Sequence, residues 1–421
     1  MQYRAAKGMN DILPEEVRRW QRLEAAFRRT AELHGYGEVR TPLLEPTELF
    51  VRSVGETTDI VQKEMFTLDH HGDSLTLRPE GTASAARAYV EHTVHAREPV
   101  SRWYYLGPMF RAERPQKGRY RQFYQAGCEI FGDAGPASDA EMIDMLHRLF
   151  RELGIADVQV LVNSLGSRGT RERYRDAVRA HLLPLRAELS EASQRRLDDN
   201  ALRILDSKNP KDQELLQGAP PILDLLDDED RAHWNALLRH LETLGVPFRV
   251  EPKLVRGLDY YTRTLFEVQS ASGGLGAQNA IGGGGRYDAM IADLGGPAVP
   301  AIGFAIGLER VLLAMGDQAI PGAPSCFVAP IGDAPVGAAL GLARTLRDRG
   351  VRVDVDARGT SVKGMLRRAN SLGARVCVLI GESELGRGVV KVKDLGAHTE
   401  VELARDAAIE EIVRVLSEGT R

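Results

Sequence analysis

The sequence predicts an α+β protein in which a large N-terminal domain of antiparallel strands and helices carries a helical insertion and precedes a smaller α/β domain. Residues 64–78 and 103–132 each have strand-like runs on both sides of turn-forming residues, which predicts two antiparallel hairpins. Residues 166–244 are charged and lack strand patterns, so we expect helices there. After residue 324, apolar strands alternate with helices, as in a compact α/β domain.

Length and composition are those of an ordinary globular protein. The chain has 421 residues, 43% of them hydrophobic and 27% charged, which allows two or three domains with a sizeable core. The net charge of -4 excludes a global basic surface, so any contact with nucleic acid has to come from local clusters. Cys128, Cys326 and Cys377 have no metal-binding or redox spacing, which predicts reduced, buried thiols.

Neither a secretory leader nor a membrane anchor is expected. The first residues, MQYRAAKGMNDILP, lack an apolar signal-peptide core, and no apolar run approaches membrane-spanning length. We therefore expect a soluble, cytoplasmic protein that makes no membrane contact.

The first predicted helix begins at Pro14. Proline and the acids Glu15 and Glu16 both suit a helix N-terminus. Its apolar face follows at helical spacing, with Val17, Trp20, Leu23 and Phe27. A short strand over 38–41 is expected next, stopped by Pro42.

A polar junction follows the first hairpin. Residues 78–82, Arg-Pro-Glu-Gly-Thr, put the Glu80 carboxylate and the Thr82 hydroxyl where a strand meets a helix. Thr82 either caps the helix or helps to bind an ammonium group. His70 and His71 lie in the turn of the hairpin, where no third ligand stands at usable spacing, so we expect solvated side chains rather than a metal site.

The second hairpin encloses a basic loop. Between residues 111 and 121 five basic residues face the single acid Glu113, and aromatic residues are interleaved with them: Arg111, Arg114, Lys117, Arg119 and Arg121, with Phe110, Tyr120 and Phe123. Such a loop is either a solvated surface or a site for a triphosphate with an aromatic base, or for a nucleic-acid end. Beyond it, Ser138 and Glu141 predict the start of a helix through a capping box, and 158–162 predicts a strand.

Residues 254–268, LVRGLDYYTRTLFEV, read as a strand pair interrupted by a turn. Arg256 beside Gly257 either binds a phosphate-sized anion or is a surface cation. Tyr260 and Tyr261 would point to opposite faces of a strand, so only one shares a pocket with Arg256 unless a bulge intervenes.

Two glycine-containing stretches follow. Residues 282–288, GGGGRYD, lack the ending of a phosphate loop, and we expect these glycines to let the backbone approach a small ligand. Residues 301–306 predict a buried strand that leads into a helix. Arg310 near the start of that helix binds an anion or is a surface arginine.

The domain boundary is expected in the Gly/Pro-rich stretch 317–324. In the C-terminal domain, five basic residues without an intervening acid predict contact with an RNA backbone, a solvated helix face being the alternative: Arg358, Lys363, Arg367, Arg368 and Arg375.

Together these stretches resemble the histidyl-tRNA synthetase family of class II aminoacyl-tRNA synthetases. KGMNDILP at 7–14 and the class motifs 1, 2 and 3 at 38–46, 110–113 and 303–310 carry the resemblance over nearly the whole chain. RGLDYYTRTLFE at 256–267 and GGGGRYD at 282–288 resemble the two stretches peculiar to the histidine enzymes.

The resemblance implies a catalytic domain over 1–322 of the class II type, with the helical insertion at about 166–245 and an anticodon-binding domain over 323–421. It implies a homodimer formed through motif 1, with ATP, Mg²⁺, L-histidine and tRNA(His) as substrates and partners. The histidine carboxylate would attack the α-phosphate, and the 3′-terminal ribose of tRNA would then accept the histidyl group.

Site residues are implied in the same way. For ATP, the resemblance places Arg111 and Arg256 at the α-phosphate as catalytic cations, Arg119 and Arg310 at the outer phosphates, Glu113 at the adenine amino group and Phe123 on the ring. For histidine, it implies that Glu129 and Tyr261 read the imidazole and that Glu80, Thr82 and Gln125 receive the ammonium group. The other residues of the histidine pocket are Gly81, Arg256, Tyr260 and Tyr287. For tRNA, it implies Gln116, Lys117, Arg358, Lys363, Arg367 and Arg368. No carboxylate cluster marks a metal site.

One alternative is the catalytically silent paralogue that serves as a regulatory subunit of ATP-phosphoribosyltransferase. That paralogue lacks the anticodon-binding domain and has degraded signature residues. Because Arg111, Arg256 and Arg310 are present and a whole domain follows residue 324, the sequence favours the enzyme.

Overall fold

The computed structural model describes residues 3–56, 58–205, 207, 209–255, 258, 260–272, 274–275, 279–316, 325–358 and 361–418. The chain divides into two compact units, unit 1 over 1–318 and unit 2 over 319–421. The predicted linker 317–324 lies outside the described residues, and with it the expected boundary at 322/323.

Unit 1 contains eleven described strands. They are β1 (Gly37–Glu38), β2 (Leu44–Pro46), β3 (Phe66–His70), β4 (Asp73–Leu77), β5 (Ser101–Phe110), β6 (Gln122–Phe131), β7 (Val158–Ser164), β8 (Phe248–Val250), β9 (Thr262–Ser270), β10 (Ala280–Arg286) and β11 (Ala301–Gly307).

The α-helices of unit 1 are α1 (Pro14–Leu33), α2 (Thr47–Val54), α3 (Thr82–Glu91), α4 (Pro136–Glu152), α5 (Arg168–Leu182), α6 (Glu191–Asp199), α7 (Pro210–Leu215), α8 (Asp228–Leu244), α9 (Met290–Asp293) and α10 (Leu308–Ala314). Short turns of 3₁₀ or π type are η1 (Ile60–Glu64), η2 (Val94–Ala96), η3 (Leu183–Glu188), η4 (Ala201–Ile204), η5 (Leu216–Gly218) and η6 (Ile222–Leu225).

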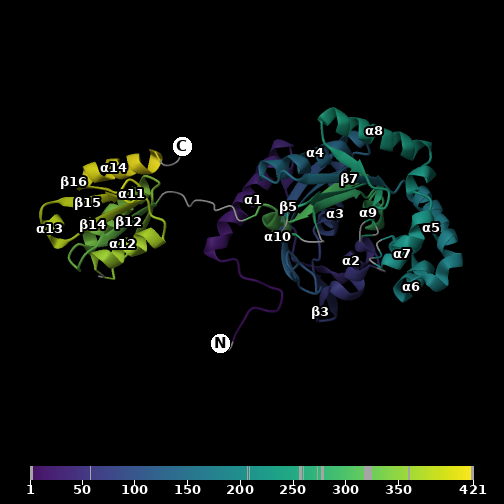
Figure 1. Cartoon of the computed structure of the whole chain (residues 1–421), viewed down its shortest axis with the longest axis horizontal. Helices are drawn as coiled ribbons and strands as arrows, with labels where there is room; N and C mark the ends of the chain where they lie inside the picture. The colour runs from purple at the N-terminus through teal and green to yellow at the C-terminus, as the bar shows by residue number, and fades with distance from the viewer. Residues whose placement is uncertain are drawn as a thin grey trace. The chain divides into compact units, whose positions relative to one another are not determined.

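The core of unit 1 is an eight-stranded sheet in the order β1-β5-β6-β11-β10-β9-β7-β8. The pairs from β5 to β7 are antiparallel, and β1 and β8 add parallel edges. Helices α1, α4 and α8 pack on one face, and α3 and α9 pack on the other (Figure 1). The predicted class II type of antiparallel sheet with helices is confirmed.

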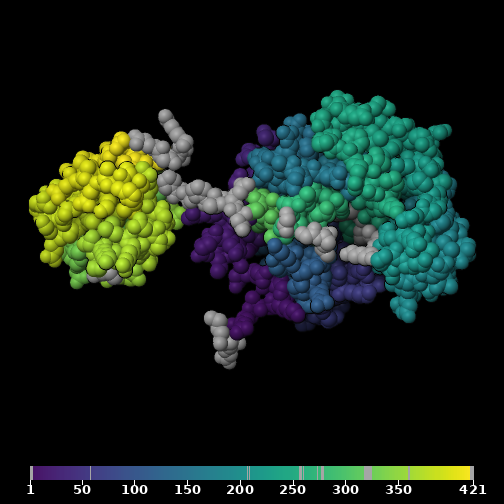
Figure 2. Space-filling view, viewed as in Figure 1, coloured from purple at the N-terminus to yellow at the C-terminus, as the bar shows by residue number. Residues whose placement is uncertain are grey.

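Several expected elements are present. Helix α1 begins at Pro14 and buries Trp20, Leu23 and Phe27 against the sheet. The two hairpins are β3–β4 and β5–β6. Between β7 and β8 the described residues form helices and connecting loops without a strand, and Figure 2 shows them as one teal lobe.

Three expectations were wrong in detail. Helix α4 begins at Pro136, two residues before the expected cap, and the Ser138 hydroxyl donates a hydrogen bond to Asp133 in place of capping. The strand expected over 38–41 is reduced to β1. The pair expected over 254–268 contains the single strand β9, because the described residues before Thr262 pair with no neighbouring strand.

Unit 2 is an α/β domain with the sheet order β13-β12-β14-β15-β16. The first three strands are parallel and the last two are antiparallel to their neighbours. Its elements are β12 (Ser325–Pro330), α11 (Val336–Asp348), β13 (Arg352–Val355), α12 (Val362–Ser371), β14 (Val376–Ile380), α13 (Glu382–Gly386), β15 (Val389–Asp394), β16 (Thr399–Ala404) and α14 (Arg405–Glu418). Except for α13, all of these elements were expected.

The three cysteines are buried and unpaired, as expected. Within the described ranges, no helix combines the length and apolar character needed to cross a membrane.

Candidate active site

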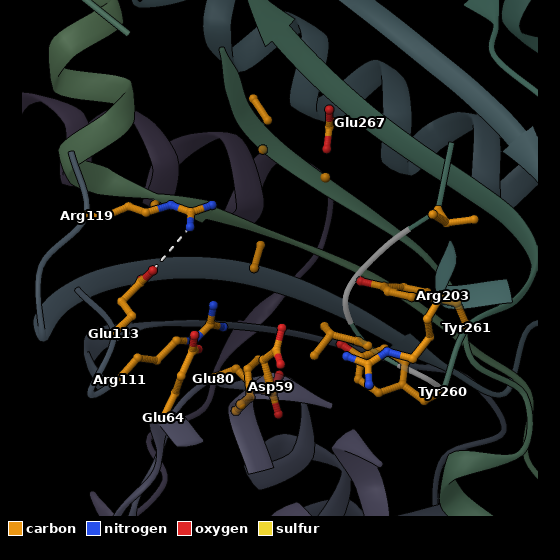
Figure 3. Close-up of a pocket in the computed structure, with 18 of the residues that line it drawn as sticks. Asp59, Glu64, Glu80, Arg111, Glu113, Arg119, Arg203, Tyr260, Tyr261 and Glu267 are labelled. Carbon is orange, nitrogen blue, oxygen red and sulfur yellow. Dashed lines mark hydrogen bonds and ion pairs between the residues drawn. The ribbon is translucent and has the colours of Figure 1, made fainter. Parts of the chain in front are cut away.

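A cavity of about 1090 Å³ opens in unit 1 between the central sheet and the helical insertion. Its core wall comes from β6, β9, β10, β11 and the basic loop between β5 and β6. Its other wall comes from the insertion, and Figure 3 shows Arg203 from that side beside Tyr260 and Tyr261.

Arg111 is the fixed cation at one end of the cavity. It directly follows β5, and its Nε donates to the Pro79 carbonyl at 2.9 Å. Its guanidinium carbon lies 5.3 Å from the centre of the Phe123 ring, which β6 brings alongside in the hairpin. Burial lowers the pKa of Arg111, and the carboxylates of Glu113 and Glu64 oppose that shift.

The loop from 111 to 121 is closed by an ion pair. Arg119 Nη1 lies 3.2 Å from Glu113 Oε2 (Figure 3). These two side chains are the ones that the resemblance assigns to the outer phosphates and to the adenine amino group. Both line the cavity, but their mutual contact has to open before each can bind a different part of ATP.

Glu80, rather than Thr82, caps helix α3. Its two carboxylate oxygens accept the Thr82 and Ala83 backbone amides at 2.8 and 2.7 Å. Burial raises the pKa of Glu80, and these two amides oppose the shift. The reading of Thr82 as the helix cap is therefore wrong, because its hydroxyl donates instead to Glu129 Oε1 at 2.7 Å.

Glu129 is completely buried and lies behind the cavity wall. Besides Thr82, the hydroxyls of Tyr105 and Tyr287 donate to it, at 3.2 and 2.5 Å. Burial raises the pKa of Glu129 to about 8, although the hydrogen bonds from these hydroxyls oppose the shift. Thr82 and Tyr287 line the cavity, whereas Glu129 does not, so these two hydroxyls stand between it and the open space.

Both signature tyrosines line the cavity. The ring centres of Tyr260 and Tyr261, both labelled in Figure 3, are 4.6 Å apart. The Tyr260 ring centre lies 5.6 Å from that of Tyr287. The expectation of opposite faces was wrong, because both residues precede β9 and strand alternation does not apply to them. Arg256 and Gly257 lie outside the described residues.

The remaining predicted residues fall into three groups. Gln125 and Arg310 line the cavity, with Arg310 Nη1 donating to the Ala280 carbonyl at 2.8 Å. Gly81 lies beneath the wall, at the start of α3. Gln116 and Lys117 lie in the loop that follows β5, where both are exposed.

Several cavity residues were not expected from the sequence. Glu267 and Gln269 project from β9 into the cavity, as do Glu64 and Glu309 from other elements. Glu267 and Gln269 are two apart and alternate with the apolar residues Phe266 and Val268, which marks one polar face, and that signal identifies them in retrospect. Burial raises the pKa of Glu309 to about 7, while the Tyr124 amide, at 3.0 Å, opposes the shift. The insertion adds Arg171, Arg196 and Arg203.

The basic patch of unit 2 is partly neutralised. Arg358 and Arg368 both pair with the buried carboxylate of Asp356, at 2.5 and 2.9 Å. Arg375 pairs with Asp394 at 3.0 Å. Lys363 and Arg367 are exposed on α12. Acids outside the basic stretch thus reach into it, which the local sequence did not reveal.

A central antiparallel sheet bearing a cationic and tyrosine-lined cavity, joined to a separate α/β unit, defines a class II aminoacyl-tRNA synthetase. The family model described as histidyl-tRNA synthetase matches residues 8–311, and an anticodon binding domain model matches 325–415. The chain belongs to the histidyl-tRNA synthetase family.

Relatives agree with this assignment. The chain is 63% identical over 408 residues to the histidine–tRNA ligase of Sorangium cellulosum, covering 97% of this chain and 95% of the relative. It is 48% identical over 400 residues to that of Geobacter sulfurreducens, covering 94% and 96%. The apo crystal structure of Staphylococcus aureus histidyl-tRNA synthetase superposes with a TM-score of 0.82 at 33% identity, covering 98% of this chain and all of that one. The protein is a ligase that charges tRNA with histidine, and the silent regulatory paralogue is not favoured.

Proposed function

We propose that the cavity of unit 1 binds ATP and L-histidine side by side, forms histidyl-adenylate and passes the histidyl group to tRNA(His). One observation carries the proposal: a single cavity joins a cationic, aromatic end at Arg111 and Phe123 to a hydroxyl-lined end at Thr82, Tyr260 and Tyr287. The first end suits a nucleotide and the second suits a small polar amino acid.

ATP occupies the cationic end. Phe123 stacks on the adenine ring, and Glu113 accepts its amino group once the ion pair with Arg119 has opened. Arg119 is then free to join Arg310 at the outer phosphates. Arg111, held by the Pro79 carbonyl, stays at the α-phosphate, where the resemblance also places Arg256.

Magnesium fits the polar wall nearby. A magnesium ion bound with ATP neutralises phosphate charge, and it takes oxygen ligands from one or two carboxylates and the phosphates themselves. Glu267 has such a carboxylate on the cavity wall, steadied by a hydrogen bond from Gln269 at 2.8 Å. Among the described residues, no group of three or more His, Cys, Asp or Glu residues forms a dedicated metal cage.

The histidine end has an unused acceptor. Gln125 Oε1 is buried in the cavity wall and accepts no hydrogen bond from any residue that the structure describes. A buried acceptor without a donor is costly, so a bound ammonium group at this point would stabilise the site. The Glu80 carboxylate also lines the cavity, although both of its oxygens already accept amides.

Imidazole recognition falls to the tyrosines and Glu129. Tyr261 hydrogen-bonds one imidazole nitrogen, and the Tyr287–Glu129 pair hydrogen-bonds the other. The Tyr260 ring packs against the rings of Tyr261 and Tyr287. A site that hydrogen-bonds both nitrogens leaves buried polar groups unpaired when an apolar analogue enters, which gives strong selectivity.

The chemistry proceeds in two displacements. A histidine carboxylate oxygen bonds to the α-phosphorus while the bond to the bridging oxygen breaks and pyrophosphate leaves. Charge gathers around phosphorus, so the buried Arg111 cation lowers the barrier more than it tightens ATP binding. The tRNA ribose hydroxyl then attacks the histidyl carbonyl, AMP leaves, and an adenylate phosphate oxygen takes the hydroxyl proton.

The further partners are also proposals. We assign Lys363, Arg367, Arg358 and Arg368 of unit 2 to the tRNA backbone, and Gln116 and Lys117 to its acceptor end. A homodimer through residues 38–46 is supported by Leu43, Leu44 and Leu68, which are 40–43% exposed in unit 1. Because charged tRNA is used in translation, we propose that the protein acts in the cytoplasm.

Pyrophosphate exchange measured with each of the twenty amino acids tests the proposal. We expect exchange with histidine alone, and charging of tRNA(His) by the same preparation. Exchange with another amino acid would overturn the assigned specificity. Absence of any exchange would overturn the assigned adenylation.

A further inference from the structure

Tyr105 lies one layer behind the cavity, where the resemblance assigns it no role. It is fully buried on β5, and its hydroxyl is 3.2 Å from Glu129 Oε1 and 3.4 Å from Thr82 Oγ1. It faces Gly127 across the β5–β6 pair, two residues before Glu129 on β6. The hydroxyl is thus aimed at the carboxylate that also holds Thr82 and Tyr287.

Two glycines make room for the Tyr105 side chain. A Cβ atom added at Gly81 would lie 2.2 Å from Tyr105 Cε2, and one at Gly127 would lie 2.4 Å from the Tyr105 hydroxyl oxygen. Both distances are far below any van der Waals contact, so a side chain at either position would displace the ring. The ring therefore occupies a slot that exists only because both positions are glycine.

A third glycine, Gly303, leaves space for the Glu129 carboxylate. A Cβ atom at Gly303, which pairs with Glu129 across β11 and β6, would lie 1.6 Å from Glu129 Oε2. The carboxylate is therefore held from three sides: Thr82 and Tyr105 donate to Oε1, Tyr287 donates to Oε2, and Gly303 lets it lie against the strand.

We propose that Tyr105 is a positioning residue for histidine recognition, which fixes the Glu129 carboxylate so that Thr82 and Tyr287 present their hydroxyls to the amino acid. The inference rests on the proposed function, because it assumes that histidine occupies the hydroxyl-lined end. Tyr105 itself touches no substrate, since Thr82 and Tyr287 stand between it and the cavity.

Removal of the Tyr105 hydroxyl alone distinguishes a positioning role from a packing role. If Tyr105 only filled the core, phenylalanine would serve equally well in the same slot. Tyr105→Phe keeps the ring and removes one of the three hydroxyl donors to the buried Glu129 side chain. The Glu129 side chain is then held less firmly against the hydroxyls of Thr82 and Tyr287.

Tyr104→Phe is the matched control. Tyr104 is the preceding residue on β5 and is equally buried, but its hydroxyl donates to Glu32 of α1 at 3.2 Å. Each variant loses one hydroxyl from the same strand, on opposite faces of the sheet.

The test measures pyrophosphate exchange and equilibrium binding with the full chain. For Tyr105→Phe we expect the KM and Kd for L-histidine to rise about ten-fold, the scale for losing one hydrogen bond. The Kd for L-histidinol, which keeps the imidazole and the ammonium group, should rise by the same factor. The KM for ATP and the melting temperature should match those of Tyr104→Phe.

Equal histidine affinity in the two variants would overturn the positioning role while leaving the proposed function intact, provided that the wild-type chain exchanges with histidine. So would a loss shared equally by histidine and ATP, which indicates general damage. If the wild-type chain itself shows no exchange with histidine, the proposed function and this inference fail together.

Discussion

Arg286 and Asp139 form a fully buried, two-point ion pair that joins β10 to α4, with Nη2–Oδ1 and Nε–Oδ2 distances of 2.5 and 3.2 Å. The carbonyls of Asp133 and Gly135 accept the remaining guanidinium protons together with Asp288. Asp139 also accepts hydrogen bonds from Thr264 and His233. The pair therefore fixes β10, which Tyr287 directly follows, to the helices behind it.

Asp139→Asn should destabilise unit 1 by about 3–5 kcal/mol, because it leaves a buried cation without its counter-charge. Denaturant unfolding measures the change. Glu172→Gln is the control, since it breaks the exposed Arg168–Glu172 pair on α5 and should cost about 0.5 kcal/mol or less. Equal losses for the two variants would show that the buried pair contributes no more than a surface pair.

Arg111→Ala should lower the rate of histidine-dependent pyrophosphate exchange by roughly 10² or more, the scale for losing one preorganised charge donor. Arg256→Ala should do the same. Arg114→Ala is the control, because Arg114 is exposed on the same loop and outside the cavity. Near-normal exchange by Arg111→Ala would show that Arg111 does not act on the reacting phosphate.

The raised pKa of Glu129 predicts that folding stability depends on pH. Its pKa is raised from 4.5 to about 8, so the protonated form stabilises the fold. This contribution is fully present below about pH 4.5 and is lost as the pH rises towards 8. Glu129→Gln stays neutral at all pH values and should flatten the wild-type slope of unfolding free energy over this range. A slope unchanged by the substitution would mean that Glu129 titrates near its ordinary value.

Removal of residues 325–421 should leave histidine adenylation measurable while raising the KM for tRNA. Unit 2 has its own buried core and a separate sheet, so the cavity of unit 1 stays complete without it. Exchange and charging assays on the shortened chain measure the two effects. Unimpaired charging would show that the basic residues of unit 2 are only a solvated surface.

Local chemistry was sufficient to predict many elements. Pro14 with two following acids marks a real helix start, and turn residues between alternating runs mark both hairpins. The basic loop at 111–121 and the tyrosines at 260 and 261 could be named from the sequence because their residue types and order are distinctive. Motif resemblance then led to the family, which the comparisons confirm.

Only the tertiary structure decided how these residues meet. Sequence periodicity reports which side of one strand a residue faces, whereas the cavity depends on the register between strands far apart in the chain. That register buries Glu129 behind Thr82 and Tyr287. Two other contacts depend on local side-chain conformation, which residue order does not report: Glu80 caps α3, and Asp356 pairs with Arg358 and Arg368. The sequence by itself determined the family and named candidate site residues such as Arg111, Phe123 and Tyr261. Packing determined which of them line the cavity and which hold the others in place.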